Sequence, residues 1–239
     1  MNILILGGYG YTGKLLAKHL LARTNHTIIL AGRNSEKAAA YAKELNSERV
    51  SVRRVDAADA ISLREGLKGV DFLLVTAPTT HQADTVIEAA LNAGVDYLDV
   101  QFSDVKLASL YKHKTDIEKK NLCFVTEAGY HPGLPSALVR YAAGKLNMIE
   151  SALTAGYLNI GEIPYTEAVD ELMEGFIHYQ AQVFKNGAWT KPNSWKMRKF
   201  DFGPEIGKRD CYSMFFEEIR GLPEMYPTLK ETGFYISGS

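Results

Sequence analysis

The chain has 239 residues, of which 46% are hydrophobic and 23% are charged, and its formal net charge is −1. These values are ordinary for a globular protein that is long enough to bury one large core or two small ones. A net charge so close to zero provides no basic surface for nucleic acid, and no apolar run is long enough to span a bilayer. The N-terminus lacks the basic region of a signal peptide, and Cys123 and Cys211 form neither a disulfide framework nor a metal motif. We therefore expect a cytoplasmic protein with no metal, nucleic-acid or membrane partner.

A glycine-rich turn follows the first predicted strand, residues 3–6. Four apolar residues in a row are typical of a strand that is buried on both faces of a parallel sheet. Gly8, Gly10 and Gly13 then match G-x-G-x-x-G, and an apolar helical stripe follows them. Such a turn points free backbone N–H groups at an anion, and a side chain at Gly10 would keep a pyrophosphate away. Against the alternative of a purely structural turn, the motif predicts a dinucleotide site that uses Gly7, Gly10, Tyr11, Thr12 and Gly13.

Strands and helices alternate through the rest of the first half. Apolar runs predict strands over residues 27–30, 50–55, 70–75, 97–100 and 122–126. Helices are expected after a Ser35 cap, near Leu63 and Leu67, over 83–91 with Gly94 as the C-cap, and over 104–120. This succession predicts an α/β Rossmann fold, a doubly wound parallel sheet with ligands at the carboxyl ends of its strands.

The end of the second strand carries Arg33 and Asn34, twenty residues after the glycine motif. Folds that prefer NAD usually place an acid here to bind the ribose hydroxyls, whereas an arginine suits a 2′-phosphate. No acid occupies residues 31–34, so the sequence predicts NADP as the cofactor. The alternative is an exposed arginine that happens to follow a strand.

Two further strand ends complete the predicted cofactor site. Asp56 and Ala57 follow the third strand, where they border the adenine or form an ordinary turn. Ala77 and Pro78 follow the fourth strand, where small residues let the nicotinamide ribose approach.

Candidates for the chemistry follow the fifth and sixth strands. His131 precedes a Pro-Gly turn, and its imidazole titrates near neutrality, so it could transfer the proton that accompanies a hydride. It could equally serve only as a hydrogen-bonding turn residue. Gln101 is the second candidate, for contact with the nicotinamide or the substrate, whereas Asp99 could simply anchor a loop.

Residues 7–13, 30–34, 97–100 and 128–134 together resemble the saccharopine dehydrogenase-like family of NADP-binding oxidoreductases. The resemblance covers about residues 1 to 145 well and the remainder loosely. It implies a Rossmann domain, then an α+β domain that carries substrate contacts and a dimer interface, so a homodimer is expected. In this family the chain typically returns to the Rossmann domain afterwards.

We therefore predict an NADP-binding Rossmann domain over residues 1–146 and an incomplete α+β substrate and dimerisation domain over 147–239. In the second half, residues 151–160, 196–202, 212–216 and 233–238 are strand-like. Thr166 is placed to cap a helix, and Asn186-Gly187 is a strong hairpin signal. The apolar ending at Phe234, Tyr235 and Ile236 has no obvious cover, so we expect a natural chain to continue past Ser239.

Two groups of side chains in this half have competing interpretations. A basic cluster could bind substrate carboxylates or form a solvated hairpin face: Lys196, Arg198, Lys199, Lys208 and Arg209. Trp189 and Trp195 could line a pocket or anchor a core.

The sequence thus predicts an NADPH-dependent oxidoreductase that transfers a hydride to or from a small carbonyl, imine or enoyl substrate. The resemblance allows imines of amino-acid or polyamine precursors and lipid-like enoyl compounds. The alternative is a non-catalytic NADP(H)-binding sensor or scaffold, which needs the same glycine loop but no proton donor.

Overall fold

A computed structural model describes residues 1–159, 161, 165, 167–177, 179–192 and 197–238. The chain forms two compact units, Met1–Ala128 with Glu167–Leu172, and Gly129–Thr166 with Met173–Ser239. The predicted domain boundary after residue 146 remains a prediction. The expected helix cap Thr166, together with Trp195, Lys196 and the end of the strand expected over 151–160, lies outside the described residues.

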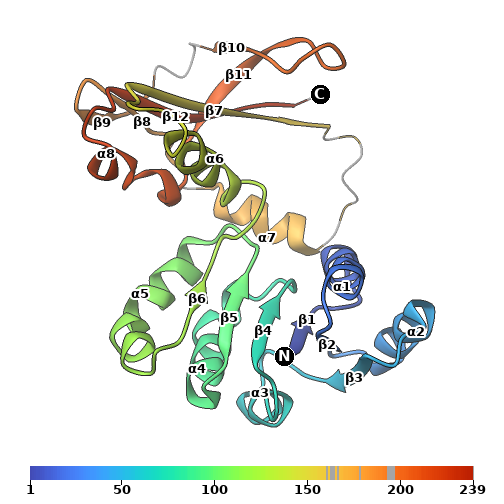
Figure 1. Cartoon of the computed structure of the whole chain (residues 1–239). Coiled ribbons are helices and arrows are strands. Elements are labelled where there is room, and N and C mark those ends of the chain that lie inside the picture. The colour runs from blue at the N-terminus through green and yellow to red at the C-terminus, as the bar shows by residue number, and fades with distance from the viewer. Residues whose placement is uncertain (160, 162–164, 166, 178, 193–196, 239) are drawn as a thin grey trace. The chain divides into compact units, whose positions relative to one another are not determined.

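The first unit alternates strands and helices as expected (Figure 1). Its strands are β1 (Asn2–Leu6), β2 (Thr27–Gly32), β3 (Val50–Arg54), β4 (Phe72–Val75), β5 (Asp96–Asp99) and β6 (Phe124–Val125). Its helices are α1 (Tyr11–Arg23), α2 (Ser35–Leu45), α3 (Ala60–Gly66), α4 (Ala83–Ala93), α5 (Asp104–Lys119) and the first part of α7 (Glu167–Gly175).

The sheet of this unit has the strand order β3-β2-β1-β4-β5-β6, and all of these neighbours pair in parallel. The chain order reverses between β1 and β4, so the crevice at their carboxyl ends is the expected ligand position of a doubly wound sheet. The predicted Rossmann fold is confirmed.

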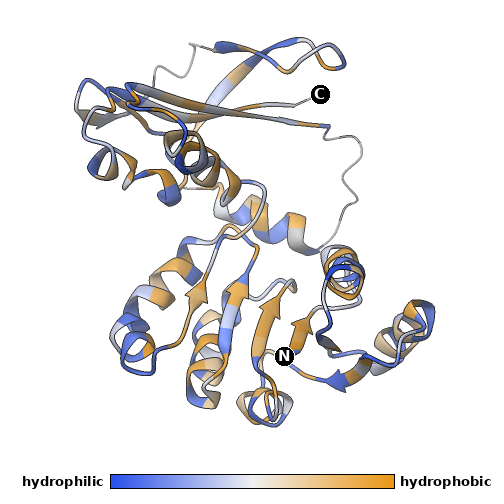
Figure 2. Ribbon diagram, viewed as in Figure 1, coloured by the Kyte–Doolittle hydropathy of each residue, from blue (hydrophilic) through white to orange (hydrophobic). Residues whose placement is uncertain are grey.

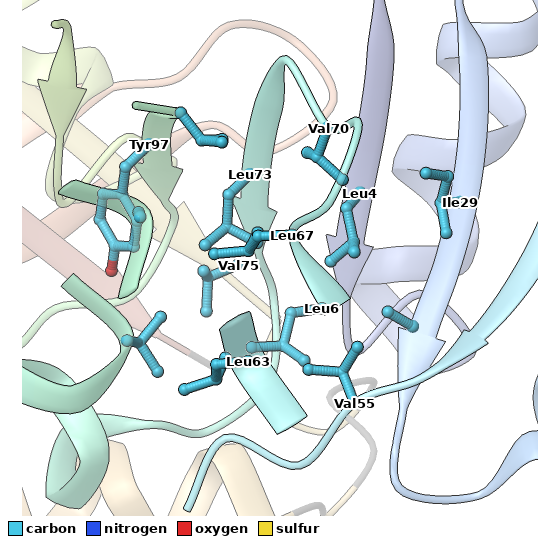
Figure 3. Packing of buried hydrophobic residues seen from close by; sticks show 14 of the residues in the cluster. Leu4, Leu6, Ile29, Val55, Leu63, Leu67, Val70, Leu73, Val75 and Tyr97 are labelled. Atoms are coloured by element: carbon cyan, nitrogen blue, oxygen red, sulfur yellow. The ribbon is translucent and has the colours of Figure 1, made fainter. Parts of the chain in front are cut away.

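Apolar side chains project from both faces of the sheet, because successive residues of a strand point in opposite directions. Leu4 and Leu6 of β1 pack with α3 and α4 in one cluster, which Figure 3 shows from close by. Ile3 and Ile5 pack with α1 and α2 in the other cluster. The two covered faces explain why β1 and β4 are apolar almost throughout (Figure 2).

The helix ends of this unit largely follow the sequence signals. Gly94 ends α4 in the left-handed conformation with φ 68°, as expected. The cap of α2, however, is Asn34 and not Ser35, because the Asn34 side chain accepts a hydrogen bond from the Lys37 N–H at 2.9 Å. Ser35 is instead the first helical residue.

The second unit is an α+β structure, as predicted. Its strands are β7 (Ser151–Leu158), β8 (Val183–Lys185), β9 (Ala188–Thr190), β10 (Arg198–Asp201), β11 (Lys208–Met214) and β12 (Glu231–Gly238). Helix α6 (Leu134–Ala143), the short helix α8 (Leu222–Met225), the 3-10 turn Glu217–Ile219 and the end of α7 accompany the sheet. The Asn186-Gly187 turn joins β8 to β9, which confirms the predicted hairpin.

The expectation that the last strand lacks cover is wrong. β12 pairs in parallel with β7 along one edge and antiparallel with β8 and β11 along the other. Phe234 and Tyr235 are consequently buried. A strand read alone shows only its apolar character, whereas its parallel neighbour β7 lies 80 residues back along the chain, since Glu231 pairs with Ser151.

Within the described part of the chain, no helix combines the length and apolar character needed to cross a membrane. The same residues contain no group of three or more His, Cys, Asp or Glu side chains arranged to hold a metal ion.

Candidate dinucleotide-binding site

The glycine loop between β1 and α1 is packed so tightly that two of its glycines are required by the fold itself. Gly7 has φ 88°, and a Cβ built on it would lie 2.7 Å from the Ala77 backbone N. A Cβ on Gly13 would overlap the Gly7 carbonyl oxygen and lie 2.8 Å from the Gly8 Cα. These two residues therefore shape the loop and bring it against the end of β4.

Gly10 differs from these two, because its backbone conformation does not require a glycine and an added Cβ would have one close contact among the described residues. Its φ of −76° suits any residue, and the nearest atom to an added Cβ is the Gly7 carbonyl oxygen at 3.2 Å. The side of Gly10 on which a side chain would stand is open. A bare backbone at an exposed position is what a ligand that approaches closely requires.

The N-terminus of α1 lies directly at this open position. Among the described residues no side chain caps α1, and no acidic residue occupies its first turn. Tyr11 and Thr12, the first two helical residues, are both exposed. The unsatisfied N–H groups and the helix dipole favour an anion here, so the loop fits the pyrophosphate of a dinucleotide.

The end of β2 lies beside the same loop. Arg33 is exposed over 72% of its side chain, and its only ion pair among the described residues is with Glu167 at 4.0 Å. The Asn34 N–H donates a hydrogen bond of 3.0 Å to the Tyr9 hydroxyl, while the Asn34 side chain caps α2. Tyr9 thus connects the glycine loop to this strand end, a contact that the sequence analysis did not assign.

The other predicted cofactor residues lie at the ends of β3 and β4. The Asp56 carboxylate accepts a hydrogen bond of 3.0 Å from the Ala58 N–H, which is the local turn contact considered above, and Ala57 packs against the core. Ala77 contacts the glycine loop at Gly7, and Pro78 is half-buried next to it. The fold therefore gathers the predicted cofactor residues along the carboxyl edge of one sheet, whereas their contacts with a cofactor remain predictions.

A chain of polar side chains follows β5. Lys106 donates to the Gln101 carbonyl Oε1 at 2.6 Å, and the Gln101 amide Nε2 donates to Glu171 of α7 at 2.5 Å. Glu171 also accepts a hydrogen bond of 2.5 Å from the Thr80 N–H. Gln101, a predicted catalytic residue, is therefore held at both ends of its amide group.

Lys106 is buried completely, which is rare for a lysine. Its burial lowers the pKa of its ammonium group, while the Asp99 and Glu171 carboxylates act in the opposite direction. Lys106 was not among the residues predicted from the sequence, although it lies three residues before Ser109 on the buried stripe of α5. A lysine on an otherwise buried stripe was the available signal.

Asp99 anchors the end of β5, as the sequence suggested. Its carboxylate accepts hydrogen bonds from the Tyr97 hydroxyl at 2.6 Å, the Thr126 hydroxyl at 2.9 Å and the Gln101 N–H at 3.1 Å. Burial, together with this carboxylate, raises the pKa of Tyr97 well above its usual range, so the phenol stays a donor.

His131 belongs to the second unit, where it lies among aromatic rings. The ring centroids of Tyr130, Phe234 and Phe216 lie 4.9, 5.7 and 6.0 Å from that of His131. Burial lowers the pKa of the imidazole, and Glu218 partly opposes this effect. These contacts are those of a packed turn residue, and a role in proton transfer remains a prediction.

The four described residues of the basic cluster lie on β10 and β11, and two of them form ion pairs. Arg198 contacts Glu231 at 2.9 Å, and Lys199 contacts Asp210 at 3.2 Å. Trp189 packs against Phe184 and Phe215, with ring centroids 5.5 and 5.2 Å away, as a core anchor does. These contacts favour the solvated hairpin face and the core anchor over their alternatives.

This geometry defines a dinucleotide-binding domain. Residues 3–125 match the saccharopine dehydrogenase NADP binding domain, and the chain belongs to that family. Membership implies an NAD(P) cofactor, which the residues around Gly10 fit.

Two curated proteins and one solved structure show how far the similarity extends. Carboxyaminopropylagmatine dehydrogenase of Synechocystis is 25% identical, over 100% of this chain and 63% of that protein. Carboxynorspermidine synthase of Vibrio cholerae is 26% identical, over 95% of this chain and 60% of that protein. The apo structure of saccharopine dehydrogenase (L-Glu forming) from Saccharomyces cerevisiae has a TM-score of 0.73 at 17% identity. That match covers 98% of this chain and 54% of the yeast chain, and it shows the fold alone.

The chain therefore spans about 60% of the length of the curated relatives that it matches.

Proposed function

We propose that this protein is an NADP(H)-dependent oxidoreductase that reduces or forms a C=N bond in a small amine-containing substrate. The observation that carries the proposal is the open backbone at Gly10 in front of an uncapped helix α1. Family membership supports the oxidoreductase class. When bound, the cofactor supplies or accepts the hydride at C4 of its nicotinamide.

The preference for NADP over NAD rests on Arg33. No carboxylate from residues 31–34 occupies the end of β2, and the guanidinium there is exposed. A charge-assisted bond to a 2′-phosphate contributes about 1.5–3 kcal/mol when well ordered, which is a preference of about tenfold to a few hundredfold. Because the side chain is exposed, the lower end applies, and added salt weakens it.

The substrate class is inferred from the names of the two curated relatives, both of which describe carboxylated polyamine-like compounds. We extend this class to the present protein: an amine joined to an amino-acid-like group that carries a carboxylate. In the reductive direction the hydride adds to the imine carbon and a proton adds to its nitrogen.

Gln101 is the residue of the first unit that we place beside the reacting atoms. Lys106 and Glu171 fix both ends of its amide, so its orientation is set before a substrate arrives. His131 is retained as the candidate proton donor or acceptor. In this assignment His131→Asn lowers kcat while leaving the affinity for NADPH unchanged, because the proton transfer stabilises only the transition state and not the bound cofactor.

A non-catalytic NADP(H)-binding sensor is the second candidate. It is favoured by one observation: the side chains of Gln101 and His131 both have protein partners already. A sensor needs only the glycine loop and Arg33.

Two measurements separate these functions. The first is NADPH oxidation, followed by its absorbance, with pairs of amino aldehydes and amines that condense to carboxylated imines. The second is a titration of wild type and Arg33→Asp with NADPH and NADH. Turnover that is lost in Gly10→Val supports the enzyme, whereas tight NADPH binding without turnover on any pair supports the sensor. Equal affinities of the wild type for NADPH and NADH would remove Arg33 from the site.

A further inference from the structure

Tyr9 reaches from the glycine loop to the end of β2 because the residue beneath it has no side chain. A Cβ built on Gly32 would lie 2.6 Å from the Tyr9 hydroxyl oxygen and 2.7 Å from Cε1 of its ring. The ring is half-buried and packs against the cluster that contains Ile28 and Leu30. Gly32 therefore leaves room for the ring, and the core fixes its position.

In this position the hydroxyl oxygen of Tyr9 acts as a hydrogen-bond acceptor toward the protein. Its oxygen accepts the 3.0 Å hydrogen bond from the Asn34 N–H, and the Asn34 side chain is engaged in capping α2. Because the Asn34 N–H is a donor and cannot accept a hydrogen bond, the single proton of the Tyr9 phenol must point elsewhere. Among the residues that the structure describes, no acceptor receives it. The hydroxyl thus presents an unused donor at the end of β2.

Arg33 lies in the chain between Gly32 and Asn34, the two residues that Tyr9 contacts. Its guanidinium is exposed, and the Glu167 carboxylate at 4.0 Å is at the limit of an ion pair. A phenol and a guanidinium at one strand end can both donate to an anion with several oxygens, whereas neither carries the negative charge with which a carboxylate binds two ribose hydroxyls.

We propose that the Tyr9 hydroxyl binds the 2′-phosphate of NADP(H) and is, with Arg33, a specificity-determining residue of the cofactor site. This inference rests on the proposed preference for NADP. The contribution of Tyr9 is a directed hydrogen bond, whereas that of Arg33 is mainly charge. Removal of the hydroxyl therefore weakens binding by about tenfold for a ligand with the 2′-phosphate and leaves a ligand without it unaffected.

The test uses the adenosine halves of the two cofactors as probes. Wild type, Tyr9→Phe and Tyr111→Phe are titrated by calorimetry with adenosine 2′,5′-bisphosphate and with 5′-AMP. Tyr111 is an exposed tyrosine on α5 and controls for the loss of a hydroxyl as such. We expect Tyr9→Phe to lose about tenfold in affinity for the bisphosphate only, and Tyr111→Phe to match the wild type.

Gly32→Ala provides an independent variant, because its Cβ displaces the Tyr9 ring while the hydroxyl is kept. It should lower the ratio of the two affinities as Tyr9→Phe does. If Tyr9→Phe weakens both probes equally, Tyr9 only supports the loop and the inference is wrong. The inference also fails if both variants keep the wild-type ratio. If the wild type itself does not prefer the bisphosphate, the proposed NADP preference fails together with it.

Discussion

Helices α1 and α6 begin in similar ways and end up with opposite electrostatic environments. Each follows a glycine-rich turn, with Gly10 and Gly133 as the respective caps, and neither cap residue offers a side chain. The first turn of α1 contains no acidic residue. At α6, the Glu218 carboxylate accepts hydrogen bonds from the Gly133 N–H at 2.8 Å and the Ser136 N–H at 3.1 Å.

The difference shows what makes a helix N-terminus a ligand site. Free N–H groups and the helix dipole attract an anion at both helices. At α6 the chain itself provides that anion from a residue 85 positions away, so the site is already occupied by the protein. At α1 neither the cap residue nor the first turn provides an anion, which is consistent with binding of the pyrophosphate of a cofactor.

The largest expected effect concerns the backbone that holds the start of α1. Gly13→Val would place side-chain atoms on the Gly7 carbonyl, so we expect the free energy of unfolding of the first unit to fall by about 3 kcal/mol or more. Urea denaturation followed by circular dichroism measures it. Gly144→Ala at the other end of α6 is the control, because its Cβ would meet nothing nearer than 3.6 Å and its φ is −66°. Equal stability of the two variants would contradict the packing argument.

Gly10→Val tests the open character of α1 directly. The added Cβ would have one tight contact, with the Gly7 carbonyl oxygen at 3.2 Å, and valine is a poorer helix cap than glycine, so we expect the stability without ligand to fall by about 1 kcal/mol. NADPH at a hundred times its Kd stabilises the wild type by about 2.7 kcal/mol, and this increment should vanish in the variant. Thermal melts with and without NADPH provide the measurement, and a retained increment would show that the cofactor binds elsewhere.

Glu218→Ala makes the start of α6 resemble that of α1. Two N–H groups lose their charged acceptor, which should cost about 2 kcal/mol of the stability of the second unit. Added acetate, as an external carboxylate, should recover part of the loss. Glu224→Ala, an exposed acid of α8, should change stability by less than about 0.5 kcal/mol. A loss of the same size in both variants would refute the capping role of Glu218.

The smallest effect is a pH dependence at the turn before α6. Burial lowers the pKa of His131 in the folded protein, so the unfolded chain binds the proton more readily. The folded state should therefore lose stability as the pH falls below about 6.5, the unfolded value, until the folded pKa is reached. The slope stays below the ~1.4 kcal/mol per pH unit that one proton allows, since the ring keeps some contact with water.

Urea midpoints between pH 5 and pH 8 check this dependence in wild type, His131→Asn and the surface control His19→Asn. His131→Asn should flatten the dependence, and His19→Asn should leave it unchanged. If His131→Asn keeps the full slope, another group causes it.

Much of the fold was contained in the sequence because it depends on local patterns. The alternation of Leu4 and Leu6 with Ile3 and Ile5 specifies a strand with two buried faces, and the Rossmann order follows from repeated strand-helix units. Gly94 and the Asn186-Gly187 turn were identified because the backbone conformation at these positions favours particular residues. The same holds for Gly7 and Gly13, whose need for glycine is built into the loop.

The tertiary structure decided the features that join segments distant in the sequence. The burial of β12, the Glu218 cap of α6 and the contact of Lys106 and Glu171 with Gln101 each link positions that periodicity treats separately. Hydrophobic patterns specify which face of a helix or strand is buried, but they do not specify which polar group from a distant segment will contact that face. For that reason the sequence by itself located the glycine loop and Arg33, whereas only the packed structure distinguished the open helix start at α1 from the closed one at α6.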